Sequence, residues 1–119
     1  MLALRKSSPT HGLQLQDVDA PPPPGPADVL LRVRSVGVCG TDLHIDEWTP
    51  SYHFMAPALP VTLGHEFSGE VLALGADVRG LAVGQLVTVR PSVVCGVCEA
   101  CLAGRHDDCV HRHTVARRY

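Results

Sequence analysis

Four cysteines in the C-terminal part of this 119-residue sequence are spaced to bind one metal ion. Three of them recur at every third position, and the fourth follows a spacer of seven residues: Cys95, Cys98, Cys101 and Cys109. Four thiolates at such spacings can surround one tetrahedral ion without long loops to order, which is the usual arrangement of structural zinc. We therefore interpret residues 95–109 as a structural zinc loop.

Two other interpretations of these cysteines fit less well. A disulfide scaffold needs an oxidising compartment, whereas the chain has an odd number of cysteines, five, and its opening residues lack the pattern of a secretory signal. An iron–sulfur run of the bacterial ferredoxin type begins with the same spacing, but its fourth cysteine follows a much shorter spacer and precedes a proline. Here Val110 follows Cys109.

The fifth cysteine, Cys39, and the adjacent pair His65 and Glu66 form a second set of candidate metal ligands. Taken singly, a buried free cysteine is commoner than a ligand, and a histidine or glutamate at a strand edge is commonly a surface residue. Taken together, a thiolate, an imidazole and a carboxylate supply three ligands and leave one position open, as in catalytic zinc sites. Such an ion polarises an alcohol or carbonyl oxygen.

Glu66 is the weakest member of this second set on geometric grounds. Neighbours on a regular strand point to opposite faces, so His65 and Glu66 reach one ion only if the backbone bends, and Gly64 permits such a bend. We therefore expect Cys39 and His65 to be ligands, and Glu66 to be either a ligand in some states or a residue that supports one.

Short strands separated by glycine and proline turns must position both sets. Apolar or alternating stretches predict strands over residues 2–4, 13–18, 29–38, 61–74 and 86–89. Between them we predict a stiff polyproline connector, a short helix, a proline-rich loop and a single helical turn, at residues 21–26, 41–48, 50–60 and 99–105 respectively. Thr41 and His44 lie three apart and share one face of the predicted helix. The pattern indicates a small, irregular β-barrel with short helical turns.

Composition argues against several classes of partner. The formal net charge is -2 and the chain has only five aromatic residues, so we expect no nucleic-acid partner. No apolar run approaches the roughly 20 residues of a membrane span, so we expect no membrane association. A single domain in a reducing cytoplasm is the resulting expectation.

Three motifs in one order resemble those of the zinc-dependent medium-chain alcohol dehydrogenases. Residues 37–45 read Gly-Val-Cys-Gly-Thr-Asp-Leu-His-Ile, residues 64–69 read Gly-His-Glu-Phe-Ser-Gly, and the cysteine loop 95–109 follows. The first motif, with Trp48 nearby, most resembles that of the L-threonine and polyol dehydrogenases of this family. The resemblance covers about residues 25–110.

The resemblance implies a chaperonin-10-like domain with one catalytic and one structural zinc ion. It implies that the catalytic ligands are Cys39, His65 and Glu66, and that Thr41 and His44 relay the substrate proton outward while a hydride passes to NAD or NADP. The implied structural ligands are Cys95, Cys98, Cys101 and Cys109.

No dinucleotide-binding Gly-x-Gly-x-x-Gly fingerprint occurs in these residues, so the nucleotide would have to bind to a domain that the sequence does not contain. We therefore expect residues 1–119 to be an incomplete, truncated N-terminal catalytic domain that is inactive in isolation. Residues 111–119 depart from the family pattern, and we expect a mobile tail there.

Two hypotheses about function follow. In the first, the chain is the N-terminal part of a dehydrogenase that acts on a small-molecule alcohol, binds two zinc ions and forms a homo-oligomer at full length. In the second, it is a non-catalytic zinc-binding module or shortened homologue that binds one zinc ion. A ferredoxin-like electron carrier is a distant third, which visible absorbance from iron would reveal.

Overall fold

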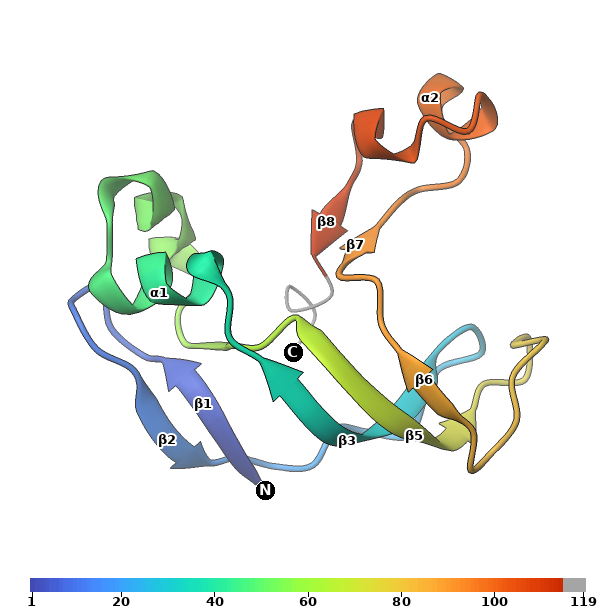
Figure 1. Cartoon of the computed structure of the whole chain (residues 1–119), viewed down its shortest axis with the longest axis horizontal. Helices are drawn as coiled ribbons and strands as arrows, with labels where there is room; N and C mark the ends of the chain where they lie inside the picture. Colours follow the sequence, from blue (N-terminus) through green and yellow to red (C-terminus); the bar gives the residue numbers. More distant parts are fainter. Residues whose placement is uncertain (115–119) are drawn as a thin grey trace.

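The computed structural model describes residues 1–114, which form eight strands and four short helices (Figure 1). Two antiparallel three-stranded sheets make up most of the fold, and a separate loop carries the four clustered cysteines. Among the described residues, no helix combines the length and the apolar character that crossing a membrane requires.

The first sheet has the strand order β2-β1-β4, with β1 at Leu2–Lys6, β2 at Gln14–Asp17 and β4 at Val61–Thr62. The predicted N-terminal pair of strands is therefore present. Lys6 at the end of β1 pairs with Val61, so the N-terminal strand is joined to a segment more than fifty residues away.

The second sheet has the order β3-β5-β6, with β3 at Val29–Gly37, β5 at Glu66–Leu74 and β6 at Leu86–Thr88. The pairing of β3 with β5 runs from Val29 opposite Leu74 to Gly37 opposite Glu66. Because β3 ends where β5 begins, the residues just after β3 and just before β5 meet at one end of the sheet.

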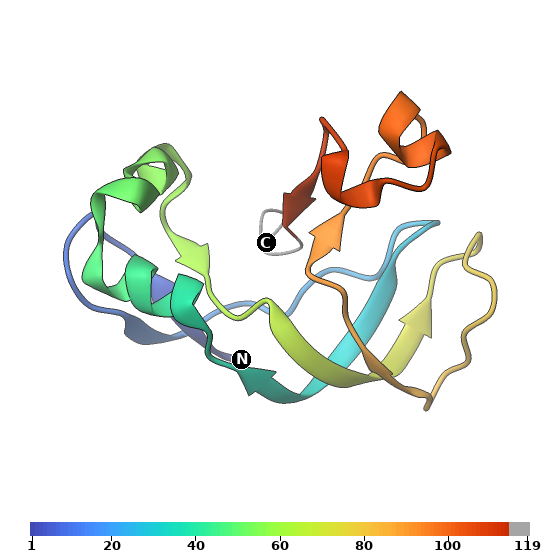
Figure 2. The same cartoon turned by 45° about the horizontal axis from the view of Figure 1, so that its top comes forward.

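Two helical segments occupy that end of the molecule (Figure 2). The helix α1, Gly40–Glu47, confirms the predicted short helix. The segment η1, Pro50–Ala58, is a 3-10 helix where the sequence predicted a loop. That prediction was wrong because Pro50 stands at the first turn, where its missing N–H removes no hydrogen bond, and Tyr52 donates its backbone N–H to Thr49.

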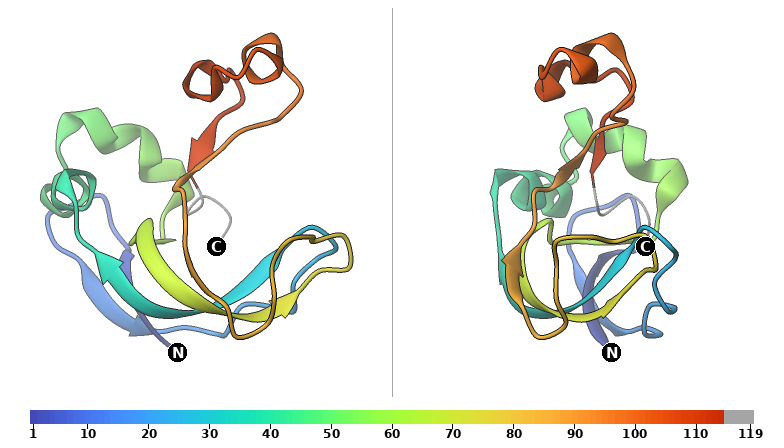
Figure 3. Two further views of the ribbon diagram at one scale, coloured as in Figure 1. Left: turned by 45° about the vertical axis from the view of Figure 1, so that its right-hand side comes forward. Right: turned by 90° about the vertical axis from the view of Figure 1, so that its right-hand side faces the viewer.

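The cysteine-rich lobe projects away from the two sheets (Figure 3). It contains β7 at Ser92–Val93, α2 at Glu99–Leu102, η2 at His106–Asp108 and β8 at His113–Thr114. Strands β7 and β8 pair and close the base of the lobe. Part of the region predicted to be a mobile tail is thus a paired strand, and residues 115–119 lie outside the described residues.

The mainly β architecture with short helical turns is confirmed, but the two main sheets do not close into a barrel over residues 1–114. The buried apolar core is small. It comprises Ala3, Ile45, Val71, Cys101 and Cys109, of which Val71 is fully buried.

Gly75 is required where the loop before β3 crosses the end of β5. A Cβ atom at this position would lie 2.0 Å from the carbonyl oxygen of Gly25 and 2.3 Å from that of Pro26. Both neighbours are backbone atoms, and the local backbone is held in place by the hydrogen bond from Gly75 N–H to the Asp28 carbonyl at 2.9 Å. A side chain therefore fits only if the two loops move apart.

We expect Gly75→Ala to lower the free energy of unfolding by about 3 kcal/mol, at the upper end of what overpacking usually costs. Chemical denaturation of the zinc-loaded chain measures this loss. Gly40→Ala is the matched control, because its added methyl group would have no neighbour within 4 Å. Equal stability of the two variants would contradict the prediction.

Candidate metal centres

Cys39 lies at the junction of β3 and α1 and is the N-cap residue of the helix. Its backbone N–H donates to the Asp42 carboxylate at 3.0 Å, and the Asp42 backbone N–H bonds back to the Cys39 carbonyl at 3.1 Å. These reciprocal bonds satisfy backbone groups that the first turn of a helix leaves free. They also fix the backbone of Cys39, from which its side chain projects.

His65 directly precedes β5 and contacts Cys39, which follows the neighbouring strand β3. Gly64 precedes it with a φ of +93°, and a Cβ atom there would lie 2.7 Å from a methyl carbon of Val36. Only glycine tolerates this turn, which directs the imidazole toward β3. The Nε2 atom of His65 lies 3.3 Å from the Cys39 sulfur, so the structure brings together the two candidate ligands that the sequence favoured.

Asp42 is a third member of this cluster, and the sequence interpretation missed its role. One of its carboxylate oxygens lies 3.8 Å from Nδ1 of His65, and the residue is only 4 % exposed. That same oxygen is buried without a hydrogen-bond partner among the described residues. The sequence did contain one signal for this role of Asp42, because an acidic residue three positions after an N-cap residue commonly bonds back to it.

The structure does not bring Glu66 into the cluster. The three side chains whose ligand atoms lie within 4.8 Å of one another are Cys39, Asp42 and His65. The side chain of Glu66 instead lies beside Gly37, its partner across the sheet. Neighbouring residues of an extended chain point to opposite faces, which separates the Glu66 side chain from that of His65.

The donor set around Cys39 fits a zinc ion. In tetrahedral coordination, a thiolate sulfur and an imidazole nitrogen on the same zinc lie about 3.5 Å apart, close to the 3.3 Å separation of Cys39 and His65. A buried carboxylate behind the other ring nitrogen of a ligating histidine is a common support of metal sites. The unpartnered oxygen of Asp42 is suited to either role, as ligand or as support.

We expect Asp42→Asn to weaken zinc binding at this centre by about 10- to 100-fold, as loss of a supporting carboxylate usually does. The neutral amide keeps the shape of the side chain but removes its negative charge beside His65. Competition with a chelator of known affinity measures the change. Asp77→Asn, in the exposed turn after β5, is the control, and an unchanged affinity in Asp42→Asn would exclude the role.

Thr41 and His44 lie on α1 as predicted, and a third residue contacts both. The hydroxyl group of Tyr52, from η1, donates to the Thr41 hydroxyl at 3.4 Å. Its ring stacks on the His44 imidazole with centroids 5.9 Å apart. Sequence reasoning missed Tyr52 because only the folding of η1 back onto α1 brings it there.

The four clustered cysteines meet in the lobe. The sulfur of Cys95 lies 3.9 Å from that of Cys101 and 3.7 Å from that of Cys109. Two thiolates on one tetrahedral zinc are expected to lie about 3.8 Å apart, so these sulfurs are already at coordination distance. Backbone N–H groups of Cys95 and Cys98 point at sulfurs of the cluster, at 3.4 Å each. All four ligand atoms lie within 4.8 Å of one another.

The thiols of this cluster differ in acidity. A backbone N–H of Cys101 lowers the pKa of Cys98 to about 6, and a backbone N–H of Cys95 lowers the pKa of Cys109. Burial, followed by the neighbouring sulfur of Cys98, raises the pKa of Cys101 to about 12. At neutral pH the cluster therefore already carries negative charge, and binding of a divalent cation would release the remaining protons.

A mainly β chain with a four-cysteine lobe and a separate cysteine–histidine–aspartate cluster has the features of the zinc-binding catalytic domains of dehydrogenases. The family model described as "Alcohol dehydrogenase GroES-like domain" matches residues 25–117, and the chain belongs to this family. The resemblance inferred from the sequence motifs is thereby confirmed.

Among curated relatives, the L-threonine 3-dehydrogenase of Cutibacterium acnes is 46 % identical over 109 residues, which is 92 % of this chain and 31 % of that protein. The L-threonine 3-dehydrogenase of Pyrococcus horikoshii is 43 % identical over 110 residues, again covering 92 % of this chain and 31 % of the relative. The chain thus spans about a third of the length of the curated relatives it matches.

Solved structures agree with the sequence relatives. The alcohol dehydrogenase of Aeropyrum pernix superposes with a TM-score of 0.82 at 35 % identity, over 98 % of this chain and 33 % of that one. Galactitol-1-phosphate dehydrogenase of Escherichia coli superposes with a TM-score of 0.84 at 27 % identity, over 98 % and 32 % respectively. The chain therefore corresponds to the GroES-like portion of zinc-dependent alcohol and polyol dehydrogenases.

Proposed function

We propose that this chain is the zinc-binding N-terminal portion of a dehydrogenase that oxidises a small alcohol and passes a hydride to NAD or NADP. The observation that carries the proposal is the contact between the Cys39 sulfur and the His65 ring, backed by the buried Asp42 carboxylate and separate from the four-cysteine lobe. Two distinct clusters of different composition fit one catalytic and one structural zinc ion.

In this proposal, Cys39 and His65 hold the catalytic ion, and Asp42 orients His65 from behind. Glu66, next in the chain, is proposed as a ligand in a different state of the site, because its side chain here lies beside Gly37. When bound, zinc would act as a Lewis acid toward an alcohol oxygen. The structural ion would be held by Cys95, Cys98, Cys101 and Cys109.

The residues of α1 and η1 have a distinct task in this proposal. Thr41 and His44 supply a hydroxyl and an imidazole on one helical face, immediately after Cys39, and they would carry the proton released by the alcohol toward solvent. Tyr52 supports this route, because its hydroxyl contacts Thr41 and its ring packs against His44. The stacking restricts the imidazole, while the hydroxyl contact defines one orientation of Thr41.

The remaining parts of the proposal concern the longer protein. NAD or NADP would bind to a further domain, residues 1–119 would form part of the catalytic domain, and the complete protein would be a cytoplasmic homo-oligomer. L-threonine and polyols are the proposed substrate candidates, since proteins named for these substrates are among the relatives and solved structures.

Zinc stoichiometry of the purified chain tests the proposal. Elemental analysis after removal of loosely bound metal is expected to give two zinc ions per chain. One ion per chain, unchanged when Cys39 is replaced, would favour the alternative of a non-catalytic zinc-binding module and would contradict the proposed catalytic centre.

A further inference from the structure

Lys6, the only lysine of the sequence, is completely buried at the end of β1. Its ammonium group donates to three backbone carbonyls, those of Thr10, of Gly12 at 3.1 Å and of Asp46 at 2.9 Å. An ammonium has three N–H donors, so all of them are used, whereas a neutral amine would leave one carbonyl unmatched. The pKa of Lys6 is lowered by burial, and the Asp46 carboxylate opposes that shift.

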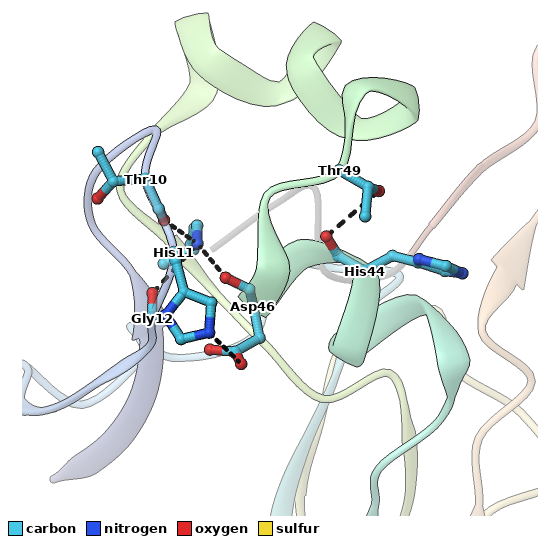
Figure 4. A network of polar contacts seen from close by, with 7 residues as sticks. Thr10, His11, Gly12, His44, Asp46 and Thr49 are labelled. Atoms are coloured by element: carbon cyan, nitrogen blue, oxygen red, sulfur yellow. Dashed lines mark hydrogen bonds and ion pairs between the residues drawn. The ribbon is translucent and has the colours of Figure 1, made fainter.

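The three carbonyls come from two separate segments (Figure 4). Thr10 and Gly12 belong to the turn between β1 and β2, while Asp46 lies in the last turn of α1. The last carbonyls of a helix lack partners within the helix and carry a partial negative charge, which a cation stabilises. Gly12 also donates its N–H to the Asp46 carbonyl at 2.9 Å, and the ammonium lies 5.3 Å from the Trp48 ring.

The main chain of Lys6 is attached to a different part of the site. Lys6 pairs with Val61 in β4, and three residues later the chain reaches Gly64 and then His65. Its side chain is bound to the end of α1, the helix that begins directly after Cys39. A single residue therefore connects the segment that delivers the histidine with the segment that delivers the cysteine.

We propose that Lys6 is a positioning residue of the Cys39–His65 centre, acting by anchoring the C-terminal end of α1 to the strand pair that leads to His65. The proposal rests on the proposed function in taking this centre to bind metal. In this proposal the eight-residue helix moves as one element, so displacing its end turns the Cys39 sulfur and the Asp42 carboxylate relative to His65. Lys6 itself contacts neither ligand side chain in this arrangement.

The test compares Lys6→Met, an unbranched side chain one atom shorter that lacks the charge and the donors, with Lys6→Arg, which keeps a positive charge and N–H donors. Arg79→Met is the matched control, since it removes a cation that donates to backbone carbonyls in the exposed turn around residues 75–80. Each variant is titrated with zinc against a chelator. Emission of Trp48, the only tryptophan, reports the surroundings of its ring, which include the Lys6 ammonium.

We expect Lys6→Met to weaken zinc binding at the Cys39–His65 centre by at least about tenfold, comparable to loss of a supporting residue, and to shift the Trp48 emission. The four-cysteine lobe is expected to keep its zinc. Lys6→Arg should recover most of the affinity, and Arg79→Met should match the unmodified chain. Equal affinity in Lys6→Met would overturn the proposal, as would global unfolding with loss of both ions, because the role proposed is local.

If the proposed function is wrong and the Cys39–His65 centre binds no zinc, the positioning role of Lys6 is tested by a different measurement. If the unmodified chain binds zinc only in the lobe, the rate at which iodoacetamide alkylates Cys39 is measured with the lobe loaded with zinc. A changed alkylation rate of Cys39 in Lys6→Met, with an unchanged rate in Arg79→Met, would then support positioning without catalysis. A rate in Lys6→Met equal to that of the unmodified chain would overturn the positioning role independently of metal binding.

Discussion

Cys101→Ser is expected to abolish zinc binding in the lobe and to unfold residues 95–109. Cys101 is one of two buried cysteines of the cluster, with 7 % exposure, and its sulfur lies 3.9 Å from that of Cys95. Structural zinc contributes apparent binding energies of about 10–16 kcal/mol in small sites, and that energy is also folding energy. The lobe has few other contacts to replace it, since it projects from the sheets (Figure 3).

Two measurements check this expectation. Elemental analysis should show the loss of one zinc ion per chain, and limited proteolysis should produce new cleavage within residues 95–109. Val97→Ala is the control, because Val97 lies in the same loop but is 76 % exposed. A Cys101→Ser variant that keeps its zinc and its resistance to proteolysis would show that the four sulfurs do not act as one site.

Cys39→Ser is expected to remove the other zinc ion and to leave the lobe intact. The change replaces a thiolate with a hydroxyl group that is a much poorer zinc ligand, so the affinity should fall by more than the roughly 100-fold that loss of a supporting residue causes. The fold should persist, because Cys39 is only partly buried and its capping bonds use backbone atoms and the Asp42 side chain.

Histidine variants provide the matched comparison for this second prediction. His65→Gln should behave like Cys39→Ser, whereas His11→Gln should keep both ions, since His11 lies in the turn after β1 with a side chain that is 77 % exposed. Elemental analysis gives the number of zinc ions per chain, and resistance to proteolysis shows whether the lobe is folded. Two ions retained in both Cys39→Ser and His65→Gln would exclude a metal centre between β3 and β5.

The residue pattern predicted most of the strands and the helix α1. Alternating apolar residues and turn signals indicated the strands that became β1, β2, β3, β5 and β6, and a glycine after Cys39 marked the start of α1. The segment η1 was predicted to be a loop because residues 50–60 contain several prolines, although proline is well tolerated in the first turn of a helix. The two-residue strands β7 and β8 were missed, since pairs so short leave no periodicity to detect.

The cluster of Cys39, Asp42 and His65 combines contacts that the sequence predicted with one that it did not. Cys39 and His65 were predicted from their types and their neighbours, and the structure places them 3.3 Å apart. Asp42 was overlooked because an acidic residue near a helix start is explained by capping alone. Lys6 was overlooked because burial of a lone cation cannot be anticipated without knowing which carbonyls the fold will direct at it.

The sequence by itself predicted the four-cysteine cluster of the lobe and the family, because the spacing of nearby cysteines and of short contiguous motifs does not depend on how distant segments pack. Only the tertiary structure decided that Asp42, rather than Glu66, lies with Cys39 and His65, and that Tyr52 and Lys6 support the same end of the sheet. The physical reason is distance along the chain: local spacing is fixed by backbone geometry, whereas contacts between β1, α1 and the start of β5 depend on how the strands pair.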